Sequence, residues 1–155
     1  MNLFPEFHRI VEANGGDDNM SGTAMTAKYI SLENYHHVSI VIMTHAWAAG
    51  TAAVTVNESS NLTGGSTAAI AIAQQWTGDS SDGDLTDTAV TSDTFNLSAA
   101  DQTHIIEIDA QSLSTGFPAL TLVVATPGSN NDYYSAFYIL SRPRYSGTTT
   151  PDPTS

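Results

Sequence analysis

A strand-like run at residues 37–45, HVSIVIMTH, constrains this chain more than any other stretch. Its apolar residues occupy both sets of alternating positions, so an extended backbone presents apolar side chains on both faces. A strand that is apolar on both faces needs a cover on each side. The run therefore predicts two packed sheets, or one sheet that packs against a neighbouring subunit.

The residues around this run continue the pattern of short strands and turns. Residues 29–33 and 51–57 also read as strands, and the small residues at 46–50 form a turn between two of them. Further strands are predicted at residues 67–76, 103–110, 119–125 and 134–141, with weaker signals within 86–97. We therefore expect an all-β fold, an antiparallel β-sandwich or jelly-roll.

The two ends of the chain differ from this central block. Residues 5–13 are predicted to form a short amphipathic helix, because Pro5 suits a first helical turn and apolar residues recur at helical spacing. The helix either covers the open end of its own domain or docks on a neighbour as an arm. The expected division is a helix and flexible link at 1–22, a β-sandwich domain at 23–145 and an extended tail at 146–155.

Composition excludes several classes of partner. The 155 residues suit one domain, and without cysteine the chain has no disulfide or thiolate metal site. Four Lys and Arg against 16 Asp and Glu give a net charge of −12, so nucleic acid is not an expected partner. We expect no membrane partner, because no apolar run is long enough to span a bilayer and the N-terminus lacks the order of a signal peptide.

Two groups of residues invite a metal-site interpretation. The acidic loop at residues 79–84, DSSDGD, has Ser81 at its third position and no glutamate in register, so it fails the calcium-binding EF-hand pattern. A solvated loop is favoured over a weak calcium site. The five histidines are not grouped, and the adjacent His36 and His37 point to opposite faces of a strand. We expect no metal and no cofactor.

Catalytic motifs do not occur in the sequence either. Glu107 and Asp109 lie on the same face of one predicted strand, where they cannot flank a sugar from opposite sides as glycosidase carboxylates do. No nucleophile elbow, zinc-protease or nucleotide-binding motif is present. The expectation is that the protein is not an enzyme.

Aromatic residues at loops and strand ends suit either sugar stacking or subunit contacts, and subunit contacts are favoured. The apolar residues of the N-terminal segment are expected to contribute to the same contacts. The predicted interface residues are Leu3, Phe4, Phe7, Trp47, Trp76, Tyr133, Tyr134 and Tyr145.

The order of elements carries a family resemblance. KYISLENYHHVSIVI is followed by AAGTAAVTV, by IIEIDA, by a Gly-Phe turn into a strand, and by a tyrosine-rich strand that ends in RYSG. This order, over most of residues 28–147, resembles small structural proteins of tailed bacteriophages. A chain of this size is most similar to their capsid decoration, or cement, proteins.

The resemblance implies a β-sandwich that forms a homotrimer, binds the major capsid protein and resides in the virion on the outer capsid surface. No binding residue of the group can be assigned to a position in this chain. Two alternatives stay open. One is a head-tail or tail structural protein of the virion, and the other is a carbohydrate-binding β-sandwich module that uses Trp47 or Trp76.

Overall fold

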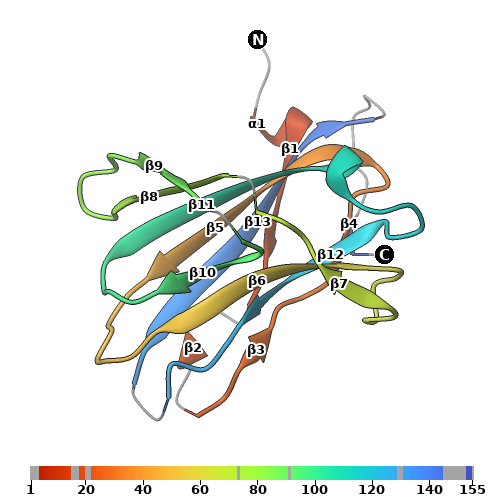
Figure 1. Ribbon diagram of the computed structural model, residues 1–155. Helices are drawn as coiled ribbons and strands as arrows, with labels where there is room; N and C mark the ends of the chain where they lie inside the picture. Colours follow the sequence, from red (N-terminus) through yellow and green to blue (C-terminus); the bar gives the residue numbers. More distant parts are fainter. Residues whose placement is uncertain are drawn as a thin grey trace.

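The computed structural model describes residues 4–14, 18–19, 22–72, 74–90, 92–128, 131–144 and 153–154. Two antiparallel sheets lie face to face and enclose one apolar core (Figure 1). The predicted all-β sandwich is therefore confirmed. None of the helices in the described residues has the length and apolar character that crossing a lipid bilayer would need.

The larger sheet is built around the strand predicted to be central. In the described residues it has seven strands, in the order β1-β13-β5-β11-β8-β9, with β2 pairing with β13 beside this path. The strand β5 pairs with β13 on one side and β11 on the other. The strands are β1 (His8–Glu12), β2 (Asp18–Asn19), β5 (Tyr35–Thr44), β8 (Gln74–Asp79), β9 (Thr86–Ala89), β11 (Gln102–Asp109) and β13 (Tyr133–Pro143).

The smaller sheet has six strands in the described residues, with β6 and β12 at its centre. Short strands share its edges: β10 and β7 both pair with β6, while β3 and β4 both pair with β12. The strands are β3 (Met25–Thr26), β4 (Ile30–Ser31), β6 (Ala52–Ser59), β7 (Thr67–Ala69), β10 (Thr94–Leu97) and β12 (Ala119–Val124). From β5 to β13 the chain repeatedly crosses between the sheets.

The core lies between the two central groups of strands. On β5, the side chains of Val38, Ile40 and Ile42 are fully buried, whereas the alternating residues are only partly buried. Facing them are fully buried aliphatic residues of β6 and β12. Burying such a side chain stabilises the fold by roughly 1.5–3 kcal/mol. The outward positions of β5 are partly buried and are occupied by His37, Ser39, Val41 and Met43, of which the last two are apolar.

The N-terminal helix is much shorter than predicted. Only α1 (Phe4–Phe7) is helical, and the following residues form β1, in which Ile10 pairs with Ile139 of β13. The predicted helix over residues 8–13 is therefore wrong, because pairing with the edge of a sheet outweighs weak local periodicity. The division of the chain at residues 22 and 145 stays a prediction.

The predicted strand over residues 67–76 is two strands that belong to different sheets. Residues 67–69 pair with β6 in the smaller sheet, and residues 74–77 pair with β9 in the larger one. Ile70 and Ile72 are buried where the chain crosses between the layers. The prediction of one continuous strand was wrong. The alternation of apolar residues continues through the segment where the chain passes from one sheet to the other, and no turn residue marks that passage.

The chain end returns to the sandwich. Pro153 is buried, and its carbonyl oxygen accepts a hydrogen bond from the backbone N–H of Ser31 at 2.7 Å. Arg144, at the end of β13, donates its backbone N–H to Asn34 at 2.9 Å. Leu3, Tyr145 and residues 146–152 and 155 of the predicted tail fall outside the described residues.

Candidate interaction surface

One face of the larger sheet combines apolar character with accessibility. We call the outward side chains of β1, β13, β5, β11 and β8 the outer face. Strand register places Phe137 next to Val41, Val41 next to Ile105, and Ile105 next to Trp76, in one row across four strands. All four side chains are partly buried by one another. The row forms an apolar band on the side away from the core.

Neighbouring rows widen this band. Ile139 lies beside Ile10, whose side chain is 58% exposed, and Met43 lies on the other side of the central row. With strands about 4.8 Å apart and same-face residues about 6.6 Å apart along a strand, these three rows cover on the order of 400 Å², part of which is the polar side chains of Ser39, Ser135 and Thr103. Apolar patches of a few hundred Å² occur on monomeric proteins and often serve binding.

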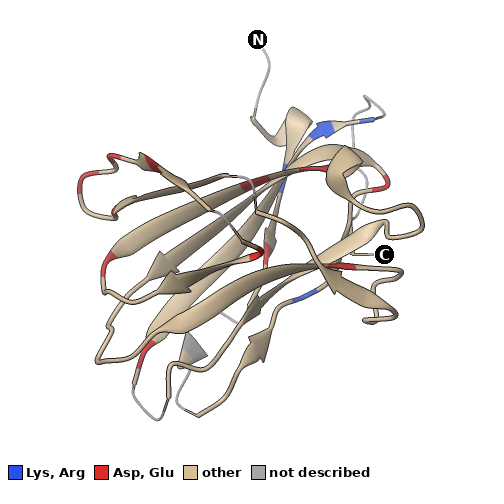
Figure 2. Ribbon diagram, in the orientation of Figure 1, with Lys and Arg blue, Asp and Glu red and all other residues tan. Residues whose placement is uncertain are grey.

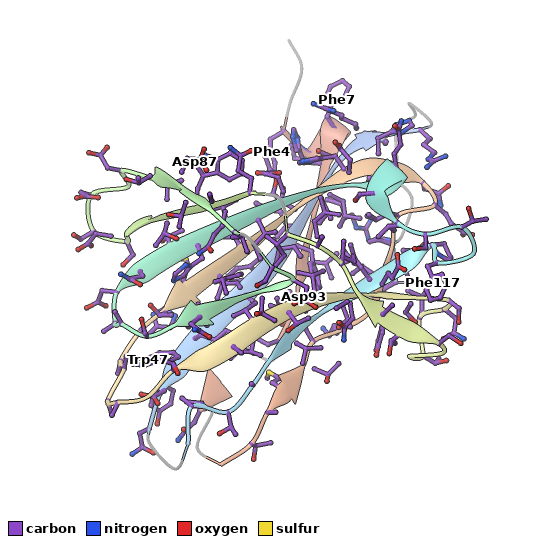
Figure 3. The ribbon with its side chains drawn as sticks, in the orientation of Figure 1. Phe4, Phe7, Trp47, Asp87, Asp93 and Phe117 are labelled. Carbon is purple, nitrogen blue, oxygen red and sulfur yellow. The ribbon has the colours of Figure 1, made fainter. Side chains whose placement is uncertain are left out.

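The band is extended by α1. Phe4 is 51% exposed and Phe7 is 38% exposed, and the ring of Phe4 stacks on His8 with centroids 4.2 Å apart. Figure 3 shows both phenylalanines on the N-terminal turn at one end of the sandwich. We call Phe4, Phe7 and Ile10 the N-terminal patch. It continues the apolar surface beyond the edge of the sheet.

A polar group borders the band. His37 Nε2 lies 2.7 Å from Glu107 Oε2, and its Nδ1 lies 3.0 Å from Ser141 Oγ. Ser39 Oγ donates a hydrogen bond to the same Glu107 oxygen at 2.8 Å. These contacts hold three neighbouring strands in register through their side chains. Glu107 therefore contacts both His37 and Ser39 through its side chain.

The hydroxyl of Ser141, the imidazole of His37 and the carboxylate of Glu107 contact one another in this order. The same order of groups is used in nucleophilic catalysis. Catalysis further needs N–H donors that stabilise a developing oxyanion. Ser141, His37 and Glu107 lie instead within paired strands, and neither cavity described below is lined by any of them. The arrangement fits a structural bridge on an accessible face.

The predicted interface residues separate into three kinds. Tyr134 is fully buried and its hydroxyl donates to Met25 Sδ at 3.0 Å, so it belongs to the core and its predicted interface role is wrong. Trp47 packs partly on the core and donates its indole N–H to Gly50 at 3.1 Å. Tyr133 is partly buried, and its hydroxyl accepts a hydrogen bond from Asn19 at 3.2 Å. Trp76 and the N-terminal phenylalanines lie on the apolar surface, so their predicted role in contacts stays open.

Sequence reasoning missed Val41, Ile105 and Phe137 as surface residues. Each lies in a strand that is apolar at both sets of alternating positions, which is the available signal. Their position in one row depends on the pairing of β13, β5 and β11. The sequence alone does not show how these strands pair.

The acidic loop uses its carboxylates locally. Asp79 accepts a hydrogen bond from the backbone N–H of Ser81 at 2.8 Å, and Asp82 accepts one from Asp84 at 3.0 Å. Hydrogen bonds from the side chain and backbone of Ser81 lower the pKa of Asp79. No group of three or more histidine, aspartate or glutamate residues in the described chain is arranged to hold a metal ion.

Two polar groups inside the sandwich have incomplete hydrogen bonding. His104 Nδ1 accepts a hydrogen bond from Gln75 Nε2 at 2.7 Å, while its buried Nε2 has no partner in the described residues. Burial lowers the pKa of His104 to about 4. Asp132 accepts a hydrogen bond from the backbone of Ala48 through one oxygen, and its other oxygen is buried without a partner in the described residues. His104 lies on β11 and Asp132 in the loop before β13, and among the described residues their hydrogen bonds go to different partners.

Two adjoining cavities open at the end of the sandwich near β4. The larger, of about 380 Å³, lies between Leu32, Leu113, Phe117, Glu33 and Arg144. The smaller, of about 260 Å³, shares Glu33 and Pro118 with it and also contacts Ser31. Figure 3 shows Phe117 on the loop that borders this end.

Comparisons with known proteins found similar solved structures but no close relatives. No family model and no curated protein sequence matches the chain. The SPBc2 prophage-derived protein YomS aligns over 86% of this chain and 93% of its own, at 9% identity and a TM-score of 0.42. The coat protein of Tobacco streak virus aligns over 94% of this chain and 92% of its own, at 7% identity and a TM-score of 0.43.

A third similar structure contains the CBM22-1 and GH10 modules of the Clostridium thermocellum endo-1,4-beta-D-xylanase 10B, complexed with xylohexaose. It aligns over 96% of this chain but only 28% of its own, at 12% identity and a TM-score of 0.32. At these levels of similarity the likenesses assign neither a family nor a function to this chain.

Proposed function

We propose that this protein is a structural component of a virion, a capsid decoration protein that binds the outer capsid surface as a homotrimer. The observation that carries the proposal is the apolar outer face and its continuation into the N-terminal patch. A soluble sandwich gains nothing from an apolar second face unless something covers it. A second protein surface is the occupant that this face fits best.

The charge of the chain supports a protein partner. Lys and Arg are few in Figure 2, and acidic residues are spread over the loops and strand ends. Such a surface repels phosphate backbones and anionic lipid headgroups. In the central row of the outer face the four side chains from β13, β5, β11 and β8 are uncharged, and the row ends at Glu12 of β1 on one side and Asp87 of β9 on the other. The major capsid protein is the proposed partner.

The mechanism of stabilisation is additive. Apolar area removed from water contributes about 25 cal/mol per Å², so an apolar patch of roughly 200 Å² on each partner contributes several kcal/mol per copy before the cost of association. Many copies bound over one shell would resist the separation of capsid subunits together. No chemical step is needed for this role.

The proposal is tested with particles of the virus that encodes the chain, after this protein has been removed. Purified protein is added back and bound copies are measured by sedimentation of the particles. We expect saturable binding over the whole shell and a trimer mass in solution. Failure of the wild-type protein to bind, or binding only at one vertex, would contradict decoration, and the second result would indicate a head-tail or tail protein.

Ile105→Glu tests whether the outer face makes the contact. The substitution places a charge in the central row, and we expect at least about a tenfold loss of affinity, since an unpaired charge in an interface costs well over 1.4 kcal/mol. The matched control is Thr88→Glu, because Thr88 is exposed on the edge strand β9. Equal binding by both variants would exclude the outer face.

Carbohydrate binding is a second candidate, favoured by one observation. Trp76 lies in register with Asp87, whose carboxylate accepts a hydrogen bond from Gln74 at 2.8 Å. An accessible indole beside polar groups suits the stacking of a sugar ring. A glycan that binds saturably to wild-type protein and to Trp47→Ala, but not to Trp76→Ala, would support this function instead.

A further inference from the structure

The larger cavity at the end of the sandwich is formed by three segments that are far apart in the sequence. Leu32 and Glu33 follow β4, residues 110–118 connect β11 with β12, and Arg144 follows β13. Figure 1 shows the loop between β11 and β12 beside β4 at this end. The cavity volume of about 380 Å³ lies within the range of about 300–1,000 Å³ that is usual for small-molecule sites.

Hydrogen bonds fix the walls of this cavity. The backbone N–H of Leu32 donates to the carbonyl oxygen of Pro118 at 2.8 Å, which joins the first two segments. The backbone N–H of Ser114 donates to Glu58 Oε2 at 2.7 Å, and Glu58 is only 6% exposed on β6. The loop is thus anchored to the smaller sheet. A cavity that is already formed loses little conformational freedom when it binds a ligand.

One side of the cavity is apolar. Leu32 is fully buried, and Leu113 packs against the core from the loop between β11 and β12. Phe117 is partly buried in the same loop (Figure 3). Because a ligand that covers these side chains removes apolar surface from water, this side favours an aliphatic or aromatic group.

Two opposite charges line the same cavity without pairing with each other. Glu33 and Arg144 are both exposed, and in the described part of the chain neither side chain forms an ion pair or a hydrogen bond. A guanidinium group binds a carboxylate through two N–H donors, and a carboxylate accepts hydrogen bonds from an ammonium group. A ligand that carries both groups can therefore satisfy both residues at once.

A ligand with a single charge or with none fits this lining less well. Glu33 repels an anion and Arg144 repels a cation, whereas an uncharged ligand displaces water from both groups without replacing its hydrogen bonds. The cavity has the volume of about a dozen water molecules at about 30 Å³ each, which is enough for a compact ligand such as leucine or phenylalanine.

We propose that this cavity binds a free α-amino acid with an apolar side chain. The α-carboxylate contacts Arg144, the α-ammonium group contacts Glu33, and the apolar side chain packs against Leu113 and Phe117. Binding is noncovalent and involves no chemical step. The proposal does not depend on the capsid assignment, since none of the described lining residues belongs to a strand of the outer face.

Titration of the full-length protein with L-phenylalanine, followed by NMR, tests the site. We expect saturable binding with a dissociation constant of about 1 mM or lower. L-Phenylalanine amide lacks the carboxylate and N-acetyl-L-phenylalanine lacks the ammonium group, so each should bind at least about tenfold more weakly. Glycine lacks the apolar side chain and should also bind at least about tenfold more weakly. The absence of saturable binding of phenylalanine and leucine up to about 10 mM overturns the proposal.

Two variants test the charged contacts. Arg144→Gln should weaken the binding of phenylalanine by at least about tenfold but change that of its amide by less than about twofold, because the amide has no carboxylate to lose a partner. Glu33→Gln should give the same loss for phenylalanine and no loss for the N-acetyl derivative. The matched controls are Lys28→Gln and Glu12→Gln, which remove exposed charges of the same signs outside the described lining. Equal losses in the site and control variants would reflect net charge alone and overturn the assignment.

The backbone N–H resonances locate the bound ligand independently. Those of Leu113 and Phe117 should shift during the titration, whereas that of Trp76 on the outer face should not. Phenylalanine should also raise the melting temperature of the wild-type protein by mass action, and Arg144→Gln should lose this increase. Shifts confined to Trp76 and its neighbours on the outer face would show that phenylalanine binds elsewhere, which contradicts the proposal.

Discussion

The hydroxyl group of Tyr138 accepts a hydrogen bond at 2.9 Å from the backbone N–H of Leu122, although the two residues belong to different sheets. The same hydroxyl donates to the carbonyl oxygen of Lys28 at 3.1 Å. It thereby fills the gap along β12 between the short strands β3 and β4, which pair with different ends of β12. One side chain thus crosses the core and completes the backbone pairing of the opposite sheet.

Tyr138→Phe should destabilise the fold without changing its shape. The substitution leaves the N–H of Leu122 and the carbonyl of Lys28 without this partner inside the protein, which costs about 1–3 kcal/mol. Burial raises the pKa of Tyr138, so the hydroxyl stays protonated as a donor. Urea unfolding measures the loss, and Tyr133→Phe is the control because its hydroxyl hydrogen bond is at the surface. Equal effects of the two substitutions would contradict the bridging role.

The stability of the protein should fall between pH 6.5 and pH 4 because of His104. Its pKa is lowered to about 4 by burial in the folded protein and is near 6.5 in the unfolded chain, so the unfolded state binds more protons in this interval. The contribution of the neutral imidazole is present above pH 6.5 and is lost as the pH falls towards 4. The full effect is up to about 3 kcal/mol.

Unfolding in urea at several pH values measures this effect. His104→Gln should flatten the dependence of the unfolding free energy on pH between 6.5 and 4, while His36→Gln should leave it unchanged, since His36 is exposed. A slope that is the same in wild type and His104→Gln would show that another group is responsible.

The strands that the sequence predicts most accurately are those with long alternation. β5, β11 and β13 each keep alternating buried residues over six or more positions, and β12 is a short apolar run buried at almost every position, so the type and approximate bounds of these four strands can be predicted. Five residues of β1 contain too few apolar positions to distinguish strand from helix, and pairing with β13 decides the outcome. The prediction of a short edge strand therefore requires knowing which strand it pairs with, and the local sequence does not contain that information.

The candidate surface is less predictable than the fold. Tyr133 and Tyr134 are neighbours of the same type, yet Tyr133 is partly exposed and Tyr134 is fully buried. Which set of alternating residues of β13 faces the core is decided by the packing of the two sheets. The contact of His37 with Glu107 joins residues 70 positions apart (107 − 37), and its existence depends on register. Strands with apolar residues on both faces predict that an interface exists, but they do not show which residues form it.

Gly50→Ala should destabilise the protein more than Gly83→Ala. Both glycines have positive φ, +91° and +75°, which costs a residue with a side chain about 1–2 kcal/mol. A Cβ at Gly50 would also collide with the backbone carbonyl oxygen of Pro127, whereas at Gly83 it would meet open space. Thermal unfolding of both variants separates the two effects. Equal losses of thermal stability would indicate that the loop after β5 can shift away from Pro127.

The N-terminal patch should contribute more to association than to folding. Phe4 and Phe7 are 51% and 38% exposed and lie outside the core cluster, so Phe4→Ser combined with Phe7→Ser should lower the unfolding free energy by about 1–3 kcal/mol and leave the sandwich folded. The same variant should bind the proposed partner or a second copy at least about tenfold more weakly, since each aromatic side chain buried in an interface contributes more than 1 kcal/mol.

Leu85→Ser is the matched control for this loss of apolar surface. Leu85 is 40% exposed, close to the value for Phe7, but it lies in the loop between β8 and β9 instead of on α1. If both variants associate equally well, the N-terminal patch is an exposed apolar surface without a partner. If only the phenylalanine variant is weakened, the contact surface extends past Ile10 and includes α1, because general loss of exposed apolar area would weaken both.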